Sequence, residues 1–156
     1  MSSADAPART FDRKSRLSVL AKAEPKDLLA VWRDWCAAAR EPDYRILRTP
    51  EIGTVMVRGR AGGVGAPFNL GEMMVTRSSV TLDDGVVGHG YVQGRDKAAS
   101  LAAALVDGLG QTQQAAAIDA GITAPLAATA AERAQKRADK AAATRVEFFT
   151  VARGHD

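Results

Sequence analysis

The sequence predicts an α+β fold: an antiparallel β-sheet of about four strands, with N-terminal helices and two C-terminal helices packed on it. Three observations support this prediction. Apolar residues recur at helical spacing near the N-terminus, short β-type runs broken by glycines fill the middle, and the last third is rich in alanine. We expect residues 1–12 to form a flexible tail and residues 13–156 to form a single domain.

Two helices are expected between Arg13 and Arg40. Apolar side chains recur there at spacings of three and four, which places one apolar stripe on each helix. The stripe residues are Leu17, Leu20, Ala21, Leu28, Leu29, Val31, Trp32, Trp35 and Cys36. Pro25 sits just inside the start of the second helix, where its missing N–H costs nothing, and Pro42 marks the region where that helix must stop.

The middle of the chain, from Tyr44 to Gly94, has the character of a sheet. Short β-type runs alternate with glycines at residues 44–48, 54–58, 72–82 and 86–92. Their alternation of apolar and polar residues is typical of strands with one buried face. Asp84-Gly85 lies between two of these runs and predicts a hairpin with a type I′ turn, because that turn needs positive φ angles.

The alanine-rich zone that follows favours helices throughout. One helix is expected from Ala98 to Leu109, with its apolar residues on one face. A second helix should run from about Pro125 to Arg145. So few large apolar residues lie in it that it should cover only a strip of the core or reach a partner. A final short strand is expected at residues 146–151.

Composition excludes several classes of protein. None of the 156 residues belongs to an apolar run long enough to span a membrane, and the polar start does not resemble a secretory signal, so we expect a cytoplasmic protein. Cys36 is the lone cysteine, and with His89 and His155 it cannot complete a disulfide or a closed zinc site. We therefore expect neither a metal site nor a cofactor. The net charge of +3 permits acidic partners without requiring them.

A glycine cluster flanked by arginines is the first candidate site. Gly62, Gly63 and Gly65 follow Arg58 and Arg60 closely in the sequence. Backbone N–H groups of such a loop can converge on an anion, and arginines supply fork-shaped donors for phosphate. The Gly-Lys-Ser/Thr of a Walker motif is missing, as is the helix of a dinucleotide fingerprint. A plain glycine-rich connection between two strands stays open as the alternative.

The second candidate lies between Gly88 and Lys97. His89 has the pKa range of a catalytic acid or base, but no nucleophile or second base accompanies it, which favours a hydrogen-bonded structural role. Asp96 should cap the alanine-rich helix. Arg95 and Lys97, at the same helix start, could hold a phosphate or a carboxylate of a partner.

The other candidate functional residues have structural explanations or lack the features that their function would need. Cys36 lies on an apolar stripe and is expected to be a small core residue, and Asp83-Asp84 is typical of a turn. Arginines including Arg77 make the sheet region basic, but the aromatic side chains on which nucleic-acid bases stack are scarce there. We therefore expect no nucleic-acid partner.

Several dense motifs follow one another in a fixed order. They are Glu51-x-Gly53-x-Val55, Arg58-x-Arg60-x-Gly62-Gly63-x-Gly65-x-x-Phe68, Gly71, Thr76-Arg77, Asp84-Gly85 and Val92-Gln93-Gly94-Arg95-Asp96-Lys97, with Arg145-Val146-Glu147-Phe148-Phe149-Thr150 and Arg153-Gly154 at the end. Together these motifs resemble the G subunit of the bacterial carbon–phosphorus lyase core complex, the PhnG family. The resemblance covers nearly the full chain.

This resemblance implies a role in the use of organic phosphonates as a phosphorus source. In that family the G subunit assembles with the H, I and J subunits, and the I subunit is expected to be its most direct partner. With the I subunit and an ATP-binding-cassette-like L subunit, it takes part in the displacement of adenine from ATP by a phosphonate. The product is a ribose 1-phosphonate 5-triphosphate. The family supplies no catalytic residues that could be carried over to this chain.

We accordingly expect an accessory subunit whose basic loop and aromatic end bind other subunits. The candidate binding or interface residues are Arg58, Arg60, Gly62, Gly63, Gly65, Arg77, His89, Arg95, Asp96, Lys97, Phe148 and Phe149. Consecutive Phe148 and Phe149 would point one ring to each face of a strand, so one ring would need a partner surface. The alternative is a self-sufficient nucleotide- or phosphate-binding enzyme that uses the glycine-rich loop, Arg95 and His89.

Overall fold

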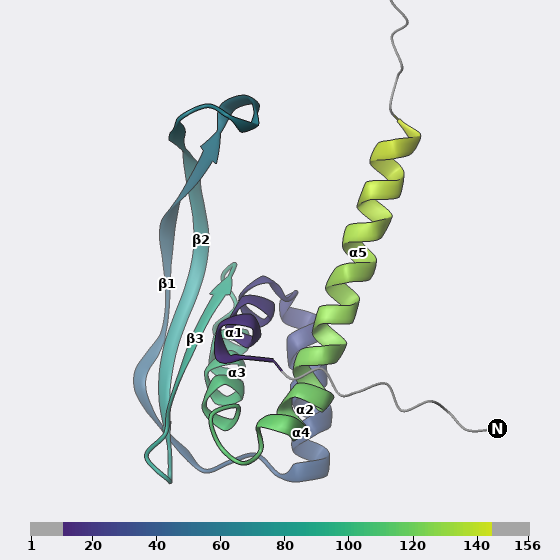
Figure 1. The fold of residues 1–156 in the computed structure, drawn as a ribbon. Coiled ribbons are helices and arrows are strands. Elements are labelled where there is room, and N and C mark those ends of the chain that lie inside the picture. Colours follow the sequence, from purple (N-terminus) through teal and green to yellow (C-terminus); the bar gives the residue numbers. More distant parts are fainter. Residues whose placement is uncertain (1–10, 145–156) are drawn as a thin grey trace, which may run out of the picture.

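A three-stranded antiparallel sheet with helices packed against it makes up the computed structural model, which describes residues 11–144 (Figure 1). The strand order is β1-β2-β3, so β2 is central. The elements are α1 (Arg13–Lys22), α2 (Pro25–Ala39), β1 (Tyr44–Arg60), η1 (Ala61–Gly63), β2 (Pro67–Leu82), β3 (Val87–Gln93), α3 (Lys97–Leu109), α4 (Ala115–Ile118), η2 (Asp119–Thr123) and α5 (Ala124–Ala143). The predicted α+β class is confirmed.

The two N-terminal helices begin and end for local reasons. Asp12 caps α1, because its Oδ1 accepts a hydrogen bond from the backbone N–H of Ser15 at 2.7 Å. Pro25 occupies the first turn of α2, as predicted. The helix ends at Ala39, and Arg40 then takes a positive φ of 65°, the turn that leads the chain away before Pro42.

The first strand is longer than the sequence indicated. The predicted runs at residues 44–48 and 54–58 are two parts of one strand, β1, which pairs with β2 from Tyr44↔Leu82 to Arg60↔Pro67. Irregularities in the register, one of them around Pro50, let the strand continue through a residue that cannot donate to a ladder. The predicted strand at residues 146–151, with Phe148 and Phe149, and the tail residues 1–10 lie outside the described residues.

Two strand glycines fix how closely α3 approaches the sheet. A Cβ atom on Gly88 would lie 2.0 Å from the carbonyl oxygen of Ala104, and one on Gly90 would lie 1.9 Å from that of Ser100. Both glycines belong to the Gly88-His89-Gly90 segment of β3, so these glycines serve helix–sheet packing. The core then forms between α3, the sheet and the N-terminal helices, around side chains such as Leu105 and Val80.

The hairpin between β2 and β3 is confirmed, but the predicted type I′ turn is wrong. A type I′ turn needs positive φ at both central residues. Gly85 has a φ of 84°, whereas Asp84 is not among the residues with positive φ. The N–H of Gly85 donates to Leu82 O at 2.9 Å, and the N–H of Leu82 donates to Val86 O at 2.9 Å. This pattern is a longer loop that ends in one left-handed glycine, which is another common way to close a hairpin.

The C-terminal helical region is nearly continuous from α4 to α5. Between them, η2 forms a turn of π-helix. In α5, Leu126 is the single buried residue of the helix, and most of its remaining length extends past the other helices (Figure 1). An ion pair of 2.6 Å between Arg133 and Asp27 ties its exposed surface to α2. The prediction that this helix covers only a strip of the core is confirmed.

Candidate functional site

The β1–β2 hairpin continues as an arm past β3 and past helices α1 to α4 (Figure 1). The third strand pairs with β2 only from Val75 to Thr81, so residues 54–74 form two strands and a connecting loop without β3 beside them (Figure 1). We call residues 54–74 the arm and the other described residues the body. Large apolar side chains of the arm are exposed: Met56, Val64, Phe68, Leu70 and Met74. A two-stranded ribbon is marginally stable in water, and such exposed side chains mark interaction surfaces.

The glycine-rich loop lies at the tip of this arm. Gly62 has a φ of 60°, which favours glycine, and the N–H of Gly65 donates to Ala61 O at 3.1 Å. A Cβ atom on Gly65 would lie 2.7 Å from that carbonyl oxygen. The local turn therefore accounts for Gly62 and Gly65, and the interpretation of this segment as a connection between two strands is confirmed. Arg58 and Arg60 precede the loop as the last arginines of β1.

The face of the sheet opposite α3 carries polar residues in two cross-strand rows. Arg48, Ser79 and His89 are register partners in one row, and Glu51, Arg77 and Tyr91 in the next. Nη1 of Arg48 and Nε of Arg77 both contact Oε1 of Glu51, at 2.7 Å and 2.6 Å. The hydrogen bond from Arg77, followed by that from Arg48, holds the pKa of Glu51 below its usual value. Glu51 thus fixes two arginines on an exposed surface.

His89 is placed by its backbone as well as by its ring. Nδ1 of the imidazole lies 2.9 Å from Oγ of Ser79, and the backbone N–H donates to Oδ2 of Asp107 at 2.9 Å. The ring is exposed on the polar sheet face. The hydrogen bonds that hold His89 are those of a structural residue, as the sequence favoured.

Two ion pairs with buried carboxylates hold α1 against the rest of the body, and the sequence analysis missed both. The guanidinium of Arg13 donates to both carboxylate oxygens of the fully buried Asp107, at 3.0 Å and 2.8 Å, and this contact raises the pKa of Arg13. Buried Arg16 contacts Oδ1 of buried Asp119 at 2.9 Å. The available signal was a lone aspartate inside an apolar helical run, as in Leu105-Val106-Asp107-Gly108-Leu109.

The residues that open α3 divide into a structural member and two exposed ones. Oδ1 of Asp96 accepts a hydrogen bond from the N–H of Ala99 at 2.9 Å, so the predicted helix cap is confirmed. Arg95 and Lys97 are exposed beside it. These three residues follow the end of β3 and therefore belong to the body, apart from the glycine-rich loop.

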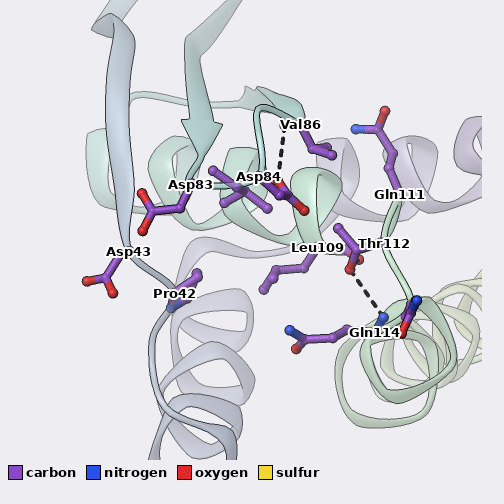
Figure 2. Close-up of a pocket in the computed structure, with 11 residues that line it drawn as sticks. Pro42, Asp43, Asp83, Asp84, Val86, Leu109, Gln111, Thr112 and Gln114 are labelled. Carbon is purple, nitrogen blue, oxygen red and sulfur yellow. Dashed lines mark hydrogen bonds between the residues drawn. The ribbon is translucent and has the colours of Figure 1, made fainter.

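A pocket of about 840 Å³ (Figure 2) opens beside the end of the β1–β2 pairing that lies opposite the arm tip. Three separate connections form it, and none of the candidate residues lines it. Asp43 and Asp83 lie on one side, and Gln111, Thr112 and Gln114 on the other (Figure 2). Asp84 also borders it, and its Oδ1 accepts from the N–H of Val86 at 3.0 Å, as expected for a turn residue. The acidic rim disfavours phosphate-type anions.

The surroundings of Cys36 agree with the structural role that the sequence predicts for it. Burial, together with the charge of Glu41, raises the pKa of the Cys36 thiol, which keeps it protonated and unreactive. Within residues 11–144, no group of three His, Cys, Asp or Glu side chains is placed to hold a metal ion. None of the described helices is both long and apolar enough to cross a membrane.

Comparison with known proteins identifies the family. A family model described as phosphonate metabolism protein PhnG matches residues 11–154. The chain is also similar to the alpha-D-ribose 1-methylphosphonate 5-triphosphate synthase subunit PhnG of Rhizobium meliloti (strain 1021), with 41% identity over 149 residues, 96% of this chain and 94% of the relative. The match spans the arm, the polar sheet face and the ion pairs of Arg13 and Arg16, and the chain belongs to the PhnG family of phosphonate metabolism proteins.

Proposed function

We propose that this chain is an accessory, non-catalytic subunit of a cytoplasmic complex that displaces adenine from ATP with an alkylphosphonate. The product is a ribose 1-alkylphosphonate 5-triphosphate. The relative is named as a subunit of the synthase that makes the methyl compound. The single observation that carries the accessory role is the exposure of apolar side chains on the arm, such as Phe68 and Leu70. Exposed apolar side chains of this kind are typical of a surface that binds another protein.

The alternative, a self-sufficient enzyme, requires the glycine-rich loop and His89 to act on one substrate. Pro67 begins β2 at the arm tip, and Ser79, the partner of His89, lies twelve residues further along the strand. At ~3.3 Å per residue this separation is about 40 Å, which is longer than a nucleoside triphosphate such as ATP. Arg95 follows the end of β3, so it lies apart from the loop too. The alternative is therefore not favoured.

The proposed partners are the other subunits of the complex. We infer that the H, I and J subunits assemble with this chain, the I subunit most directly, and that the L subunit is needed for activity. The arm supplies the proposed contact surface, with Arg58, Arg60 and the glycines of its loop at the tip. Arg77, His89, Arg95 and Lys97 on the body are secondary candidates. Phe148 and Phe149 lie outside the described residues and stay a prediction.

Reconstitution from purified subunits tests this proposal. With ATP and methylphosphonate, this chain alone should release no adenine, the full set of subunits should release it, and the set without this chain should not. The double variant Phe68→Asp/Leu70→Asp should abolish assembly and activity. Leu47→Asp, which changes a leucine of β1 outside the arm whose exposure lies between those of Phe68 and Leu70, is the matched control. Adenine release by the chain alone, or full activity without it, would contradict the proposal.

A further inference from the structure

The sheet has two outer edges, and only one of them is blocked. Along the outer edge of β3, the N–H of His89 donates to buried Asp107 at 2.9 Å. The carbonyl of Val87 on the same edge accepts from Nε2 of Gln111 at 2.9 Å. Side chains of α3 and the segment after it thus occupy the positions that an added strand would need. This is a common protection against unwanted strand pairing.

The outer edge of β1 is open along the arm. The N–H of Gly94 donates to Met74 O, so the even-numbered residues of β2 direct their backbone groups to β3 and the odd-numbered ones to β1. Val75 is the register partner of Gly53, so Gly53 points its backbone groups inward. The adjacent residues, Ile52 and Thr54, and then Met56, present theirs to the free edge. No described residue caps these three with a side chain.

The side chains beside this edge define what it could accept. Ile52 and Met56 are 39% and 54% exposed and lie on one face with Thr54. Arg58 and Arg60 follow, and neither forms an ion pair with any residue between 11 and 144. The edge therefore offers backbone donors and acceptors, then apolar side chains at alternate positions, then two cationic side chains.

We propose that this edge, from Ile52 to Arg60, binds an extended segment of a partner subunit as a fourth strand. The segment carries apolar side chains at the alternate positions that meet Ile52 and Met56, and carboxylates at the end that lies beside Arg58 and Arg60. Backbone hydrogen bonds supply affinity in this mode and side chains supply specificity. The inference rests on the proposed function, because it names how that partner binds.

A second copy of the chain fits this edge less well. Antiparallel self-pairing would place the free-edge residues 52, 54 and 56 of both copies opposite one another. In that pairing residues 48–50 of the second copy would lie beside Arg58 and Arg60, and this segment brings no negative charge to the two arginines. Glu51 cannot supply it, because Glu51 points to the opposite face and already contacts two arginines. An acidic segment of another subunit satisfies the arginines.

Amide hydrogen exchange at single-residue resolution tests the proposal without altering the chain. In the free chain, the amides of Ile52, Thr54 and Met56 should exchange quickly, while those of Gly53 and Val55 are protected by β2. In the reconstituted complex, the first three should slow by at least about 100-fold. A complex that forms while these amides keep their free rate overturns the inference and leaves the proposed function standing. Failure to assemble at all overturns the proposed function instead.

Substitutions give a second readout. Thr54→Pro removes one outward N–H, which an edge strand tolerates, and should weaken partner binding at least about tenfold. Thr54→Ala keeps that N–H and should bind as the parent does. Charge reversal by Arg58→Glu/Arg60→Glu should also weaken binding and flatten its salt dependence. Circular dichroism checks that Thr54→Pro folds, and the charge-reversed variant decides the outcome if it does not. Unchanged binding by a folded Thr54→Pro, or a stable dimer of the free chain protected at Thr54, contradicts the proposal.

Discussion

The body and the arm share two strands but differ in what stabilises them. Within the body, β2 lies between two strands and its Thr76, Ser78, Val80 and Leu82 are buried against helices. Within the arm, the same strand has one neighbour, and Leu70 is 66% exposed. The hydrophobic effect therefore stabilises the body from within the chain, whereas the arm gains comparable stabilisation only when another surface covers it. Substitutions in the two regions should accordingly affect different measurements.

The largest effect is expected where the body buries charge. Asp119→Ala leaves Arg16 buried without its carboxylate, because both side chains are almost fully inaccessible to water. We expect a loss of about 3–5 kcal/mol in the free energy of unfolding, measured in urea. Asp139→Ala, which removes an exposed carboxylate of α5, should change stability by less than about 0.5 kcal/mol. Equal effects of the two substitutions would show that the buried pair is not part of the body's stability.

A matched pair of glycines compares the two regions directly. Gly90→Ala forces a Cβ to within 1.9 Å of Ser100 O in the body, so α3 must move away from the sheet. We expect a cost of about 3 kcal/mol in urea unfolding. Gly71→Ala lies in the arm, where a Cβ would meet nothing within 4 Å, and should stay within about 0.5 kcal/mol of the parent. A destabilised Gly71→Ala would mean that the arm is packed more tightly than its exposure indicates.

The smallest effect concerns the exposed carboxylate on the polar sheet face. Arg77, and then Arg48, lower the pKa of Glu51 in the folded chain. Its contribution to stability is therefore present above the usual pKa of 4.5 and is lost as the pH falls below that value through the folded pKa. Glu51→Gln should flatten the pH dependence of thermal unfolding slightly below pH 4.5, and 1 M salt should mask the difference. An identical pH profile at low salt would count against the two ion pairs.

The sequence predicted what local chemistry decides. Spacings of three and four located α1, α2 and α3, and Asp96 was recognisable as a cap because its position needs only the following turn. The division into body and arm was not predictable, since it depends on where β3 stops beside β2. The pocket was missed because its lining comes from three connections that are distant in sequence.

The two ion pairs with buried carboxylates were missed for a related reason. A charged residue in an apolar run signals a partner but does not say which residue it is. Arg13 and Asp107 are 94 residues apart, and only the packing of α1 beside α3 brings them together. The tight contacts of Gly88 and Gly90 were hidden by the same dependence on tertiary structure, although their alternation in β3 was visible.

Charge is unequally distributed along the long axis of the molecule. Asp43, Asp83 and Asp84 border the pocket at one extremity, and Arg58 and Arg60 lie near the other, where the hairpin turns back. A molecule polarised in this way behaves as an electric dipole and rotates in the field of an approaching charged surface. The arm tip would then already face an acidic surface of another subunit when the two first meet. The rate of assembly would therefore fall as ionic strength rises.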